Sequence, residues 1–202
     1  MESTLFDLSG RVALVTGATG GLGASIVEQL AAHGAKVLMS DLDAAACEAA
    51  AQRLRDRGGN AHALPCDVSQ SASVSALAAA ALKIHGRVDA LVCNAGVQGP
   101  AGPIGAVTDD QWQQVMDVNL RSAMALTSAL TPAMADNGGG SVVLMSSIAG
   151  LRGNKAIGLY ALSKAALAQL ARNLAVEWGP KNVRVNAISP GLIRTPLATQ
   201  LL

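Results

Sequence analysis

The sequence predicts an α/β protein with a doubly wound parallel sheet, formed by a single domain over residues 1–202. A buried strand, a glycine-rich turn and a helix start follow one another over residues 11–27, and predicted strands and helices alternate along the rest of the chain. Polar or glycine-rich motifs stand at the ends of the predicted strands. Because ligands of such sheets bind beyond the carboxyl ends of the strands, we expect one shared site there.

The first element is a strand over residues 11–16, a run of β-branched and aliphatic residues without polar alternation. This composition is typical of a strand covered by helices on both faces. The turn after it contains Gly17, Gly20, Gly21 and Gly23. Glycine allows positive φ and has no Cβ, so a phosphate can approach the backbone and the free N–H groups of the helix start. The same glycines would also suit a plain tight connection, and the turn lacks the Lys-Ser/Thr of a P-loop.

The later elements repeat this alternation. A second strand, residues 36–40, ends at Asp41, at about the 20-residue distance where a ribose-binding carboxylate is expected. The remaining predicted elements are helix 43–57, strand 61–66, helix 70–85 with Ser69 as its cap, strand 88–93, helix 109–135 broken near Pro132, strand 141–146, helix 157–178 and strand 183–188.

Composition and charge limit the classes of partner. Half of the residues are apolar, the net charge is +1 and the basic residues are scattered. This pattern gives no electrostatic footprint for nucleic acid or a membrane surface, so we expect neither partner. The N-terminus is acidic and no run of about 18 apolar residues occurs, so we expect neither a signal peptide nor a membrane span.

Cysteine usage points to a reducing compartment. Cys47, Cys66 and Cys93 are irregularly spaced and form no CxxC pair. Neither a disulfide framework nor a metal site is therefore predicted. We expect a cytoplasmic protein.

Three side chains are candidates for catalysis. Tyr160, the only tyrosine, stands four residues before Lys164 in the predicted helix 157–178, so both share one helix face. Such a pair alone is more often a surface feature, or a core tyrosine beside a solvated lysine. Ser147 stands at the end of the preceding strand, and the connection from it to Tyr160 crosses the face where the glycine turn would bind a cofactor.

The order of these motifs closely resembles the short-chain dehydrogenase/reductase family of Rossmann-like oxidoreductases. The resemblance runs from Leu8 to Leu202 and implies reversible hydride transfer between a nicotinamide cofactor and a secondary alcohol or ketone. The motifs that carry it are Thr16-Gly17-x-x-x-Gly21-x-Gly23, Asp67, Asn94-Ala95-Gly96, Asn119, Ser147, Tyr160-x-x-x-Lys164 and Pro190-Gly191.

Oxidising an alcohol requires a base within hydrogen-bond reach of the hydroxyl group, and Tyr160 is our candidate. We expect the ammonium group of Lys164 to lower the pKa of the Tyr160 phenol. The resemblance implies that Ser147 donates a hydrogen bond to the substrate oxygen, that Lys164 binds the cofactor ribose, and that Asn119 holds a water molecule for proton relay. A helix-interior asparagine bonded to a carbonyl is an equally good interpretation of Asn119.

We expect NAD rather than NADP. Asp41 can accept hydrogen bonds from ribose hydroxyls, whereas a 2′-phosphate there would meet a like charge. Positions 19, 20 and 42 carry no basic residue to hold that phosphate. By resemblance, Ile193 and Thr195 would meet the nicotinamide carboxamide. The full predicted cofactor set is Gly17, Thr19, Gly20, Gly21, Leu22, Gly23, Asp41, Leu42, Asp67, Val68, Asn94, Ala95, Gly96, Tyr160, Lys164, Pro190, Gly191, Ile193 and Thr195.

Family members usually continue past Leu202 with a seventh strand and helices that cover the substrate. We expect residues 1–202 to lack that strand and lid, either because a further C-terminal segment carries them or because the protein is short. The alternative to an active enzyme is a cofactor-binding or regulatory fragment without an enclosed substrate site. The residues expected around the pocket, which are mixed in character and indicate only a small or medium alcohol or ketone, are Val97, Gln98, Ile148, Arg152, Asn154 and Leu159. The apolar faces of the predicted helices 109–135 and 157–178 favour a homodimer or homotetramer.

Overall fold

The computed structural model describes residues 4–195; residues 1–3 and 196–202 of the predicted domain lie outside the described part. Short 3₁₀ turns occur at Thr4–Phe6, Ile104–Ala106, Ile148–Leu151 and Gly179–Lys181. The main elements are β1 (Val12–Thr16), α1 (Gly21–Ala32), β2 (Lys36–Ser40), α2 (Ala44–Asp56), β3 (Asn60–Ala63), α3 (Ser71–His85), β4 (Ala90–Cys93), α4 (Asp109–Met116), α5 (Ser122–Asp136), β5 (Gly140–Met145), α6 (Gly158–Trp178) and β6 (Val183–Ile188).

Within residues 4–195, six parallel strands form one sheet in the order β3-β2-β1-β4-β5-β6. The chain order reverses between β1 and β4, which pair directly from Ala13 opposite Ala90 to Val15 opposite Val92. In a doubly wound sheet this reversal opens a crevice beyond the strand ends, where ligands bind. The predicted fold class is confirmed.

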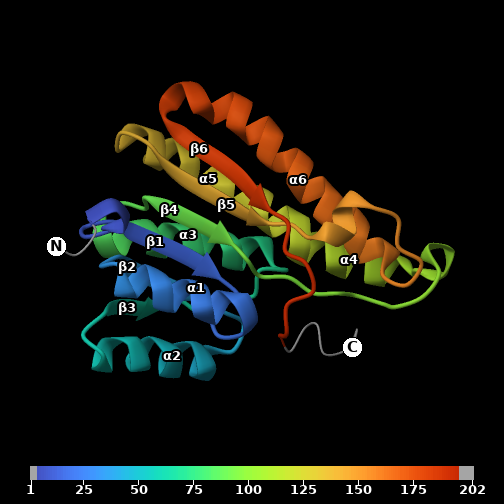
Figure 1. The fold of residues 1–202 in the computed structure, drawn as a ribbon, viewed down its shortest axis with the longest axis horizontal. Coiled ribbons are helices and arrows are strands. Elements are labelled where there is room, and N and C mark those ends of the chain that lie inside the picture. Colours follow the sequence, from blue (N-terminus) through green and yellow to red (C-terminus); the bar gives the residue numbers. More distant parts are fainter. Residues whose placement is uncertain (1–3, 196–202) are drawn as a thin grey trace.

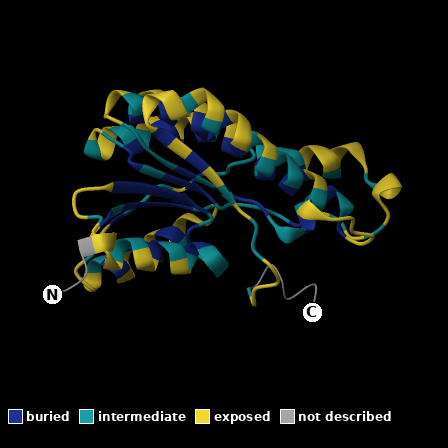
Figure 2. Ribbon diagram, turned by 45° about the horizontal axis from the view of Figure 1, so that its top comes forward, coloured by how far each residue is buried: buried dark blue, intermediate teal, exposed yellow. Residues whose placement is uncertain are grey.

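Helices cover both faces of this sheet (Figure 1). One hydrophobic cluster packs α1 and α2 against residues of β1 to β5, and a second packs α3, α5 and α6 against residues of β1, β2, β4, β5 and β6. β1 is buried at all five positions, as a strand between two helix layers must be. Figure 2 shows the same division along each helix, with buried residues toward the sheet and exposed residues outward.

The predicted long helix over 109–135 is wrong in its detail. The chain instead forms α4, a π-helical turn at Asp117–Arg121 and then α5, and Pro132 lies inside α5 without ending it. The proline removes the hydrogen bond to the carbonyl of Ser128, an exposed residue whose carbonyl can turn to water. The π-helical turn contains Asn119, and such turns occur often at functional sites.

The predicted cap of α3 is also wrong. Gln70 precedes the helix and makes no side-chain cap, whereas Ser69 donates hydrogen bonds from its backbone N–H and its hydroxyl to Asp67 Oδ1. The third strand ends at Ala63 rather than residue 66, although the Leu64 amide still bonds to the carbonyl of Met39 in β2 and the Cys66 amide to that of Asp41 just after it. In the part of the chain that the structure describes, no helix is long and apolar enough to cross a bilayer.

Candidate active site

The glycine turn between β1 and α1 requires glycine at most of its positions. Gly17 has φ +64° and Gly21 has φ +54°. A Cβ on Gly17 would stand 2.9 Å from the Asn94 amide nitrogen, and a Cβ on Gly23 would overlap the Gly17 carbonyl oxygen. Gly20 differs, because it is extended and a Cβ there would meet nothing within 4 Å.

The turn is fastened to the end of β4. Asn94 Nδ2 donates to the carbonyls of Thr16 at 3.1 Å and Gly17 at 2.9 Å. The amides of Asn94 and Ala95 both donate to Thr16 Oγ1 at 3.1 Å. These bonds hold the ends of β1 and β4 together at the point where the strand order reverses. α1 begins beside them without a side-chain cap, so its first N–H groups remain available to an anion.

Asp41 lies at the end of β2 and reaches back to the glycine turn. Its Oδ2 accepts hydrogen bonds from Thr19 N at 2.9 Å and Thr19 Oγ1 at 2.7 Å, while its Oδ1 accepts one from Leu42 N at 2.8 Å. A carboxylate offers about four acceptor sites, so Oδ1 keeps a free one. Asp41 therefore shapes the turn and still presents negative charge at this edge.

A cavity of about 420 Å³, here called the glycine-turn cavity, opens at these strand ends. Residues predicted to bind the cofactor line it, together with Cys66, Val97 and Val118. The predicted residues that line it are Gly17, Thr19, Gly20, Gly21, Leu22, Asp41, Leu42, Asp67, Val68, Asn94, Ala95, Gly96 and Thr195.

A second cavity of about 240 Å³, the catalytic cavity, lies beside it. The two cavities share Leu22, Asn94, Gly96 and Thr195, so they form neighbouring parts of one crevice. Of the other predicted residues, the catalytic cavity contains Ser147, Tyr160, Lys164, Pro190, Gly191 and Ile193. Gly23 and Asn119 line neither cavity.

Ser147 and Tyr160 enter the catalytic cavity from two elements. Ser147 follows β5 and accepts a hydrogen bond from Ala149 N at 3.1 Å, which starts a 3₁₀ turn. Tyr160 lies in the first turn of α6. Burial raises the pKa of the Tyr160 phenol, and the neighbouring Ser147 hydroxyl opposes that rise. The expected lowering of this pKa by Lys164 is not seen, so the phenol stays protonated at neutral pH.

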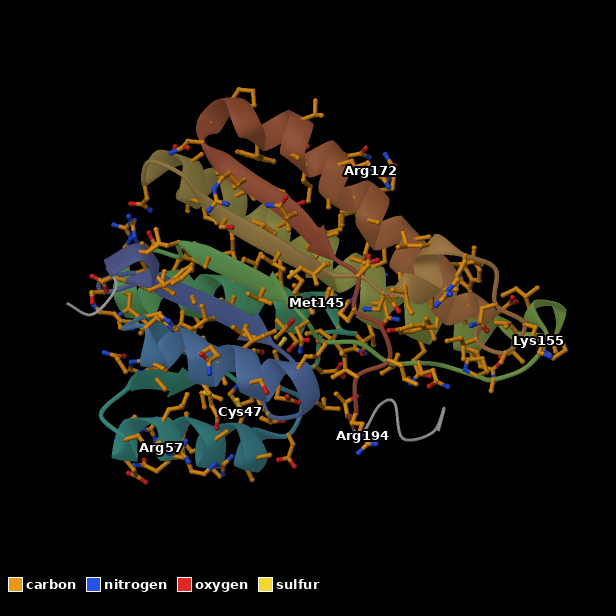
Figure 3. The ribbon with its side chains drawn as sticks, viewed as in Figure 1. Cys47, Arg57, Met145, Lys155, Arg172 and Arg194 are labelled. Carbon is orange, nitrogen blue, oxygen red and sulfur yellow. The ribbon has the colours of Figure 1, made fainter. Side chains whose placement is uncertain are left out.

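The ammonium group of Lys164 is itself disfavoured by burial. The side chain is 3% exposed, and burial lowers its pKa to about 8, with the neighbouring Cys93 acting in the opposite sense. Lys164 Nζ donates to the carbonyl of Met145 at 2.7 Å and lies 5.5 Å from the centre of the Tyr160 ring. Figure 3 shows Met145 at the end of β5, in the middle of the molecule.

The helix α6 is fixed to β5 at the same place. Ser146 Oγ donates to the carbonyl of Lys164 at 2.7 Å, so Lys164 is bonded through both its side chain and its backbone. A Cβ at Gly150 would overlap the backbone of α6 at Ala165, so the close approach of the 3₁₀ turn Ile148–Leu151 to α6 requires glycine. The sequence shows Ser146 as a polar residue at the end of a buried strand, but it does not indicate the bond to Lys164.

Asn119 is 2% exposed and ties three segments together. Its Oδ1 accepts from Val97 N at 2.8 Å, and its Nδ2 donates to Val97 O and to Ser163 Oγ, both at 2.9 Å. A Cβ at Gly96 would stand 3.3 Å from both Asn119 Oδ1 and Lys164 Nζ, so the two polar atoms approach one point beside Gly96. Sequence reasoning missed Ser163, which is fully buried and donates to the carbonyl of Tyr160 at 2.7 Å.

A six-stranded parallel sheet with a crevice at its reversal point, a glycine turn at one end of the crevice and a Ser-Tyr-Lys group at the other, defines the class of dinucleotide-binding oxidoreductases. The family model of short chain dehydrogenases matches residues 11–202. The chain belongs to the short-chain dehydrogenase/reductase family.

Similar proteins agree with this membership. Dehydrogenase/reductase SDR family member 4 from Bos taurus is 40% identical over 194 residues, which cover 96% of this chain and 70% of the relative. The structure of a 7α-hydroxysteroid dehydrogenase complexed with NADH and 7-oxo glycochenodeoxycholic acid matches with a TM-score of 0.95 at 36% identity, over 100% of this chain and 78% of that one. The structure of an NAD(P)-dependent gluconate 5-dehydrogenase from Beutenbergia cavernae with bound NADP matches with a TM-score of 0.91 at 36% identity, over 97% of this chain and 78% of that one.

Proposed function

We propose that this protein transfers a hydride between NAD(H) and a secondary alcohol or ketone, with Tyr160 as the general acid and base. The observation that carries the proposal is the crevice itself. Ser147, Tyr160 and Lys164 line a cavity that shares four residues with the glycine-turn cavity. A substrate carbonyl in the catalytic cavity would therefore lie next to a dinucleotide bound in the glycine-turn cavity.

The residues present fit a dinucleotide. Gly20 lines the cavity with open space where a Cβ would stand, and the uncapped start of α1 offers N–H groups to a pyrophosphate. Asp67 and Val68 line the end of the cavity expected to take the adenine, and Asn94 to Gly96 line its floor. The cofactor, when bound, supplies or accepts the hydride.

We propose NAD over NADP because Asp41 presents a carboxylate with a free acceptor site at the ribose end of the crevice. A ribose hydroxyl can donate to that oxygen, whereas a 2′-phosphate would be repelled by it. One similar structure contains NADH and another contains NADP, so the choice rests on Asp41 of this chain.

In ketone reduction the protein's own residues would act on the substrate oxygen. The Ser147 hydroxyl donates a hydrogen bond that orients and polarises the carbonyl. Tyr160, which burial keeps protonated, donates its proton to the oxygen as charge develops there. Lys164 binds the ribose. Asn119, whose Oδ1 approaches the same point as Lys164 Nζ beside Gly96, would hold a water that returns protons to this site.

The fragment alternative requires a crevice without a substrate site. The catalytic cavity of about 240 Å³ favours the enzyme, because it is already bounded within residues 4–195 by aliphatic side chains such as Ile148, Ile157 and Leu192. A small or medium ketone requires a pocket of this kind.

The test is oxidation of NADH in the presence of a panel of aliphatic and cyclic ketones. The loss of NADH absorbance measures the rate. Turnover should fall about 10³-fold in Tyr160→Phe, because the phenol supplies the proton. The variant should still bind NADH in a fluorescence titration. Turnover of Tyr160→Phe at the wild-type rate would refute the assignment.

We further propose that residues 1–202 act as one domain in a homodimer or homotetramer. Exposed apolar side chains of α4, α5 and α6, among them Trp112, Met124 and Leu162, could pair between subunits. Light scattering at micromolar concentration tests this, and a monomer would contradict it. We propose a cytoplasmic location on the three buried, unpaired cysteines, and fractionation of cells tests it.

A further inference from the structure

One buried polar side chain in the catalytic cavity has no partner. Gln98 is 9% exposed and lines the cavity together with Ser147 and Tyr160. Its Oε1 is buried, and among residues 4–195 nothing donates a hydrogen bond to it. Leaving such an acceptor unpaired is unfavourable, so a ligand that supplies the missing donor gains binding energy there.

The backbone on both sides holds Gln98 in place. The preceding residue, Val97, is bonded through both its N–H and its carbonyl to the Asn119 side chain. The following residue, Gly99, has φ +72°, and a Cβ there would overlap Val115. The Gln98 side chain therefore starts from a fixed point of the backbone and is buried in the cavity wall, which favours a preorganised binding group.

Two other polar side chains of the cavity already have partners. Lys164 donates to Met145, and Asn154 Oδ1 accepts from the amides of Ala156 and Ile157. Gln98 is neutral, and its amide offers one acceptor and two donor hydrogens. The best partner for the Gln98 amide is a neutral group that both donates and accepts hydrogen bonds. A hydroxyl group does both.

We propose that Gln98 is a specificity-determining residue that binds a hydroxyl group of the substrate, separate from the reacting carbonyl. The substrates would then be hydroxyketones and the corresponding diols rather than ketones with a single functional group. This inference rests on the proposed hydride transfer. A second carbonyl oxygen would satisfy Gln98 less well, because it cannot donate to the buried Oε1.

Matched substrates test the proposal. We would measure kcat/KM for 2-, 3- and 4-hydroxycyclohexanone and for the methylcyclohexanone with its methyl group at the same carbon. The wild-type protein should prefer one hydroxy isomer over its methyl counterpart by about 10- to 100-fold, the range expected for one hydrogen bond to a buried group. In Gln98→Met, a substitution of similar volume without the amide, this ratio should fall to about one or below, mainly through KM.

Gln29→Met is the matched control, because Gln29 lies on the exposed side of α1 and outside the crevice. It should keep the wild-type ratio. Gln98→Asn retains the amide but shortens the chain, and it should give a reduced ratio. If either Gln98 variant fails to fold, the wild-type ratios still decide: equal values for every hydroxy and methyl pair overturn the proposal.

The failure of this inference differs from failure of the proposed function. Reduction of cyclohexanones without a hydroxyl preference, or a preference that survives in Gln98→Met, overturns the role of Gln98 and leaves hydride transfer intact. No reduction of any ketone by the wild-type protein overturns both.

Discussion

In the half of the crevice formed by residues 16–68, the backbone of a tight glycine turn shapes the site, whereas in the half formed by residues 94–195 side chains from distant segments do so. The first half requires the absence of a Cβ at Gly17 and Gly23. The second brings Ser147, Tyr160 and Lys164 together from two elements. One half of the site thus depends on the backbone of a turn and the other on side chains from distant segments. We therefore expect the two halves to respond differently to substitution.

The sharpest test of the backbone half is Gly23→Ala. The new Cβ would overlap the Gly17 carbonyl oxygen, so the turn must open. We expect a loss of more than about 3 kcal/mol in the free energy of unfolding, because both overlapping groups are parts of the backbone. Urea unfolding measures this loss, and titration with NADH measures the accompanying loss of affinity.

Gly20→Ala is the control for folding. Gly20 is extended with nothing near its Cβ position, so we expect a change within about 0.5 kcal/mol. Equal destabilisation by the two substitutions would show that close packing of the turn does not depend on Gly23.

In the side-chain half, the corresponding test is Asn119→Ala. The substitution removes three hydrogen bonds and leaves the Val97 N–H, the Val97 carbonyl and Ser163 Oγ without their partner. We expect a loss of about 2–3 kcal/mol in the free energy of unfolding, measured with urea. We also expect faster proteolysis of the loop that follows Val97.

Asn173→Ala provides the comparison for that substitution. Asn173 is exposed on α6 and bonds only to Gln169 in the described chain, so its loss should cost about 0.5 kcal/mol or less. If Asn119→Ala were as mild, the three bonds would contribute little to holding the side-chain half together.

Asp41 is the exception that sharpens the comparison, because it is a side chain that acts in the backbone half. In Asp41→Asn the amide oxygen can still accept from Thr19, but the charge is lost. We expect the ratio of kcat/KM for NADH to that for NADPH to fall about 10- to 100-fold, or about 1.4–2.8 kcal/mol. Steady-state rates with both cofactors measure it.

Asp43→Asn is the matched control, because Asp43 is an exposed residue that caps α2 through Ala46 N. It removes the same charge two residues away and should leave the ratio within about twofold, since asparagine caps a helix equally well. A wild-type preference for NADPH would contradict the role proposed for Asp41.

The comparison also explains what the sequence could predict. Gly17, Gly21 and Gly23 form a local pattern, so the turn and its place after β1 follow from the sequence alone. The confirmed sheet follows from the alternation of strands and helices. The π-helical turn around Asn119 depends on bonds to Val97 and Ser163, which lie 22 and 44 residues away, and no local pattern encodes them.

The error about Tyr160 has the same origin. The spacing of Tyr160 and Lys164 correctly predicts one helix face, and that alone indicates an ammonium able to lower the pKa of the phenol. Burial is a property of the whole fold, and it raises the pKa of Tyr160 while it lowers that of Lys164. Gln98 likewise stands in a mixed loop whose burial the sequence does not indicate.

The smallest effect that we expect on the free energy of unfolding comes from replacing Lys164. The test is whether the substitution raises or lowers that free energy. Burial lowers the pKa of Lys164 in the folded protein from 10.5 to about 8. Below pH 8 the folded state must keep a buried ammonium, so stability is lost as pH falls from 10.5 to 8, by about 3 kcal/mol when the loss is complete. Part of this cost is offset by the bond from Nζ to Met145 O. We therefore expect Lys164→Met to be more stable than the wild-type protein by about 1 kcal/mol at pH 7, although turnover is lost.

The gain in Lys164→Met should shrink when urea unfolding is repeated at pH 9.5, because the wild-type lysine is then largely neutral in the folded state. Cys93, whose pKa burial raises to about 12, stays protonated at both pH values and does not obscure the comparison. Lys155→Met is the control: this lysine is exposed in the loop before α6 (Figure 3), so its removal should change stability little and equally at both pH values. A Lys164→Met protein that is less stable at pH 7 than the wild type would mean that the bond to Met145 outweighs burial of the charge, and the side-chain half would then be held together by the same lysine that serves its chemistry.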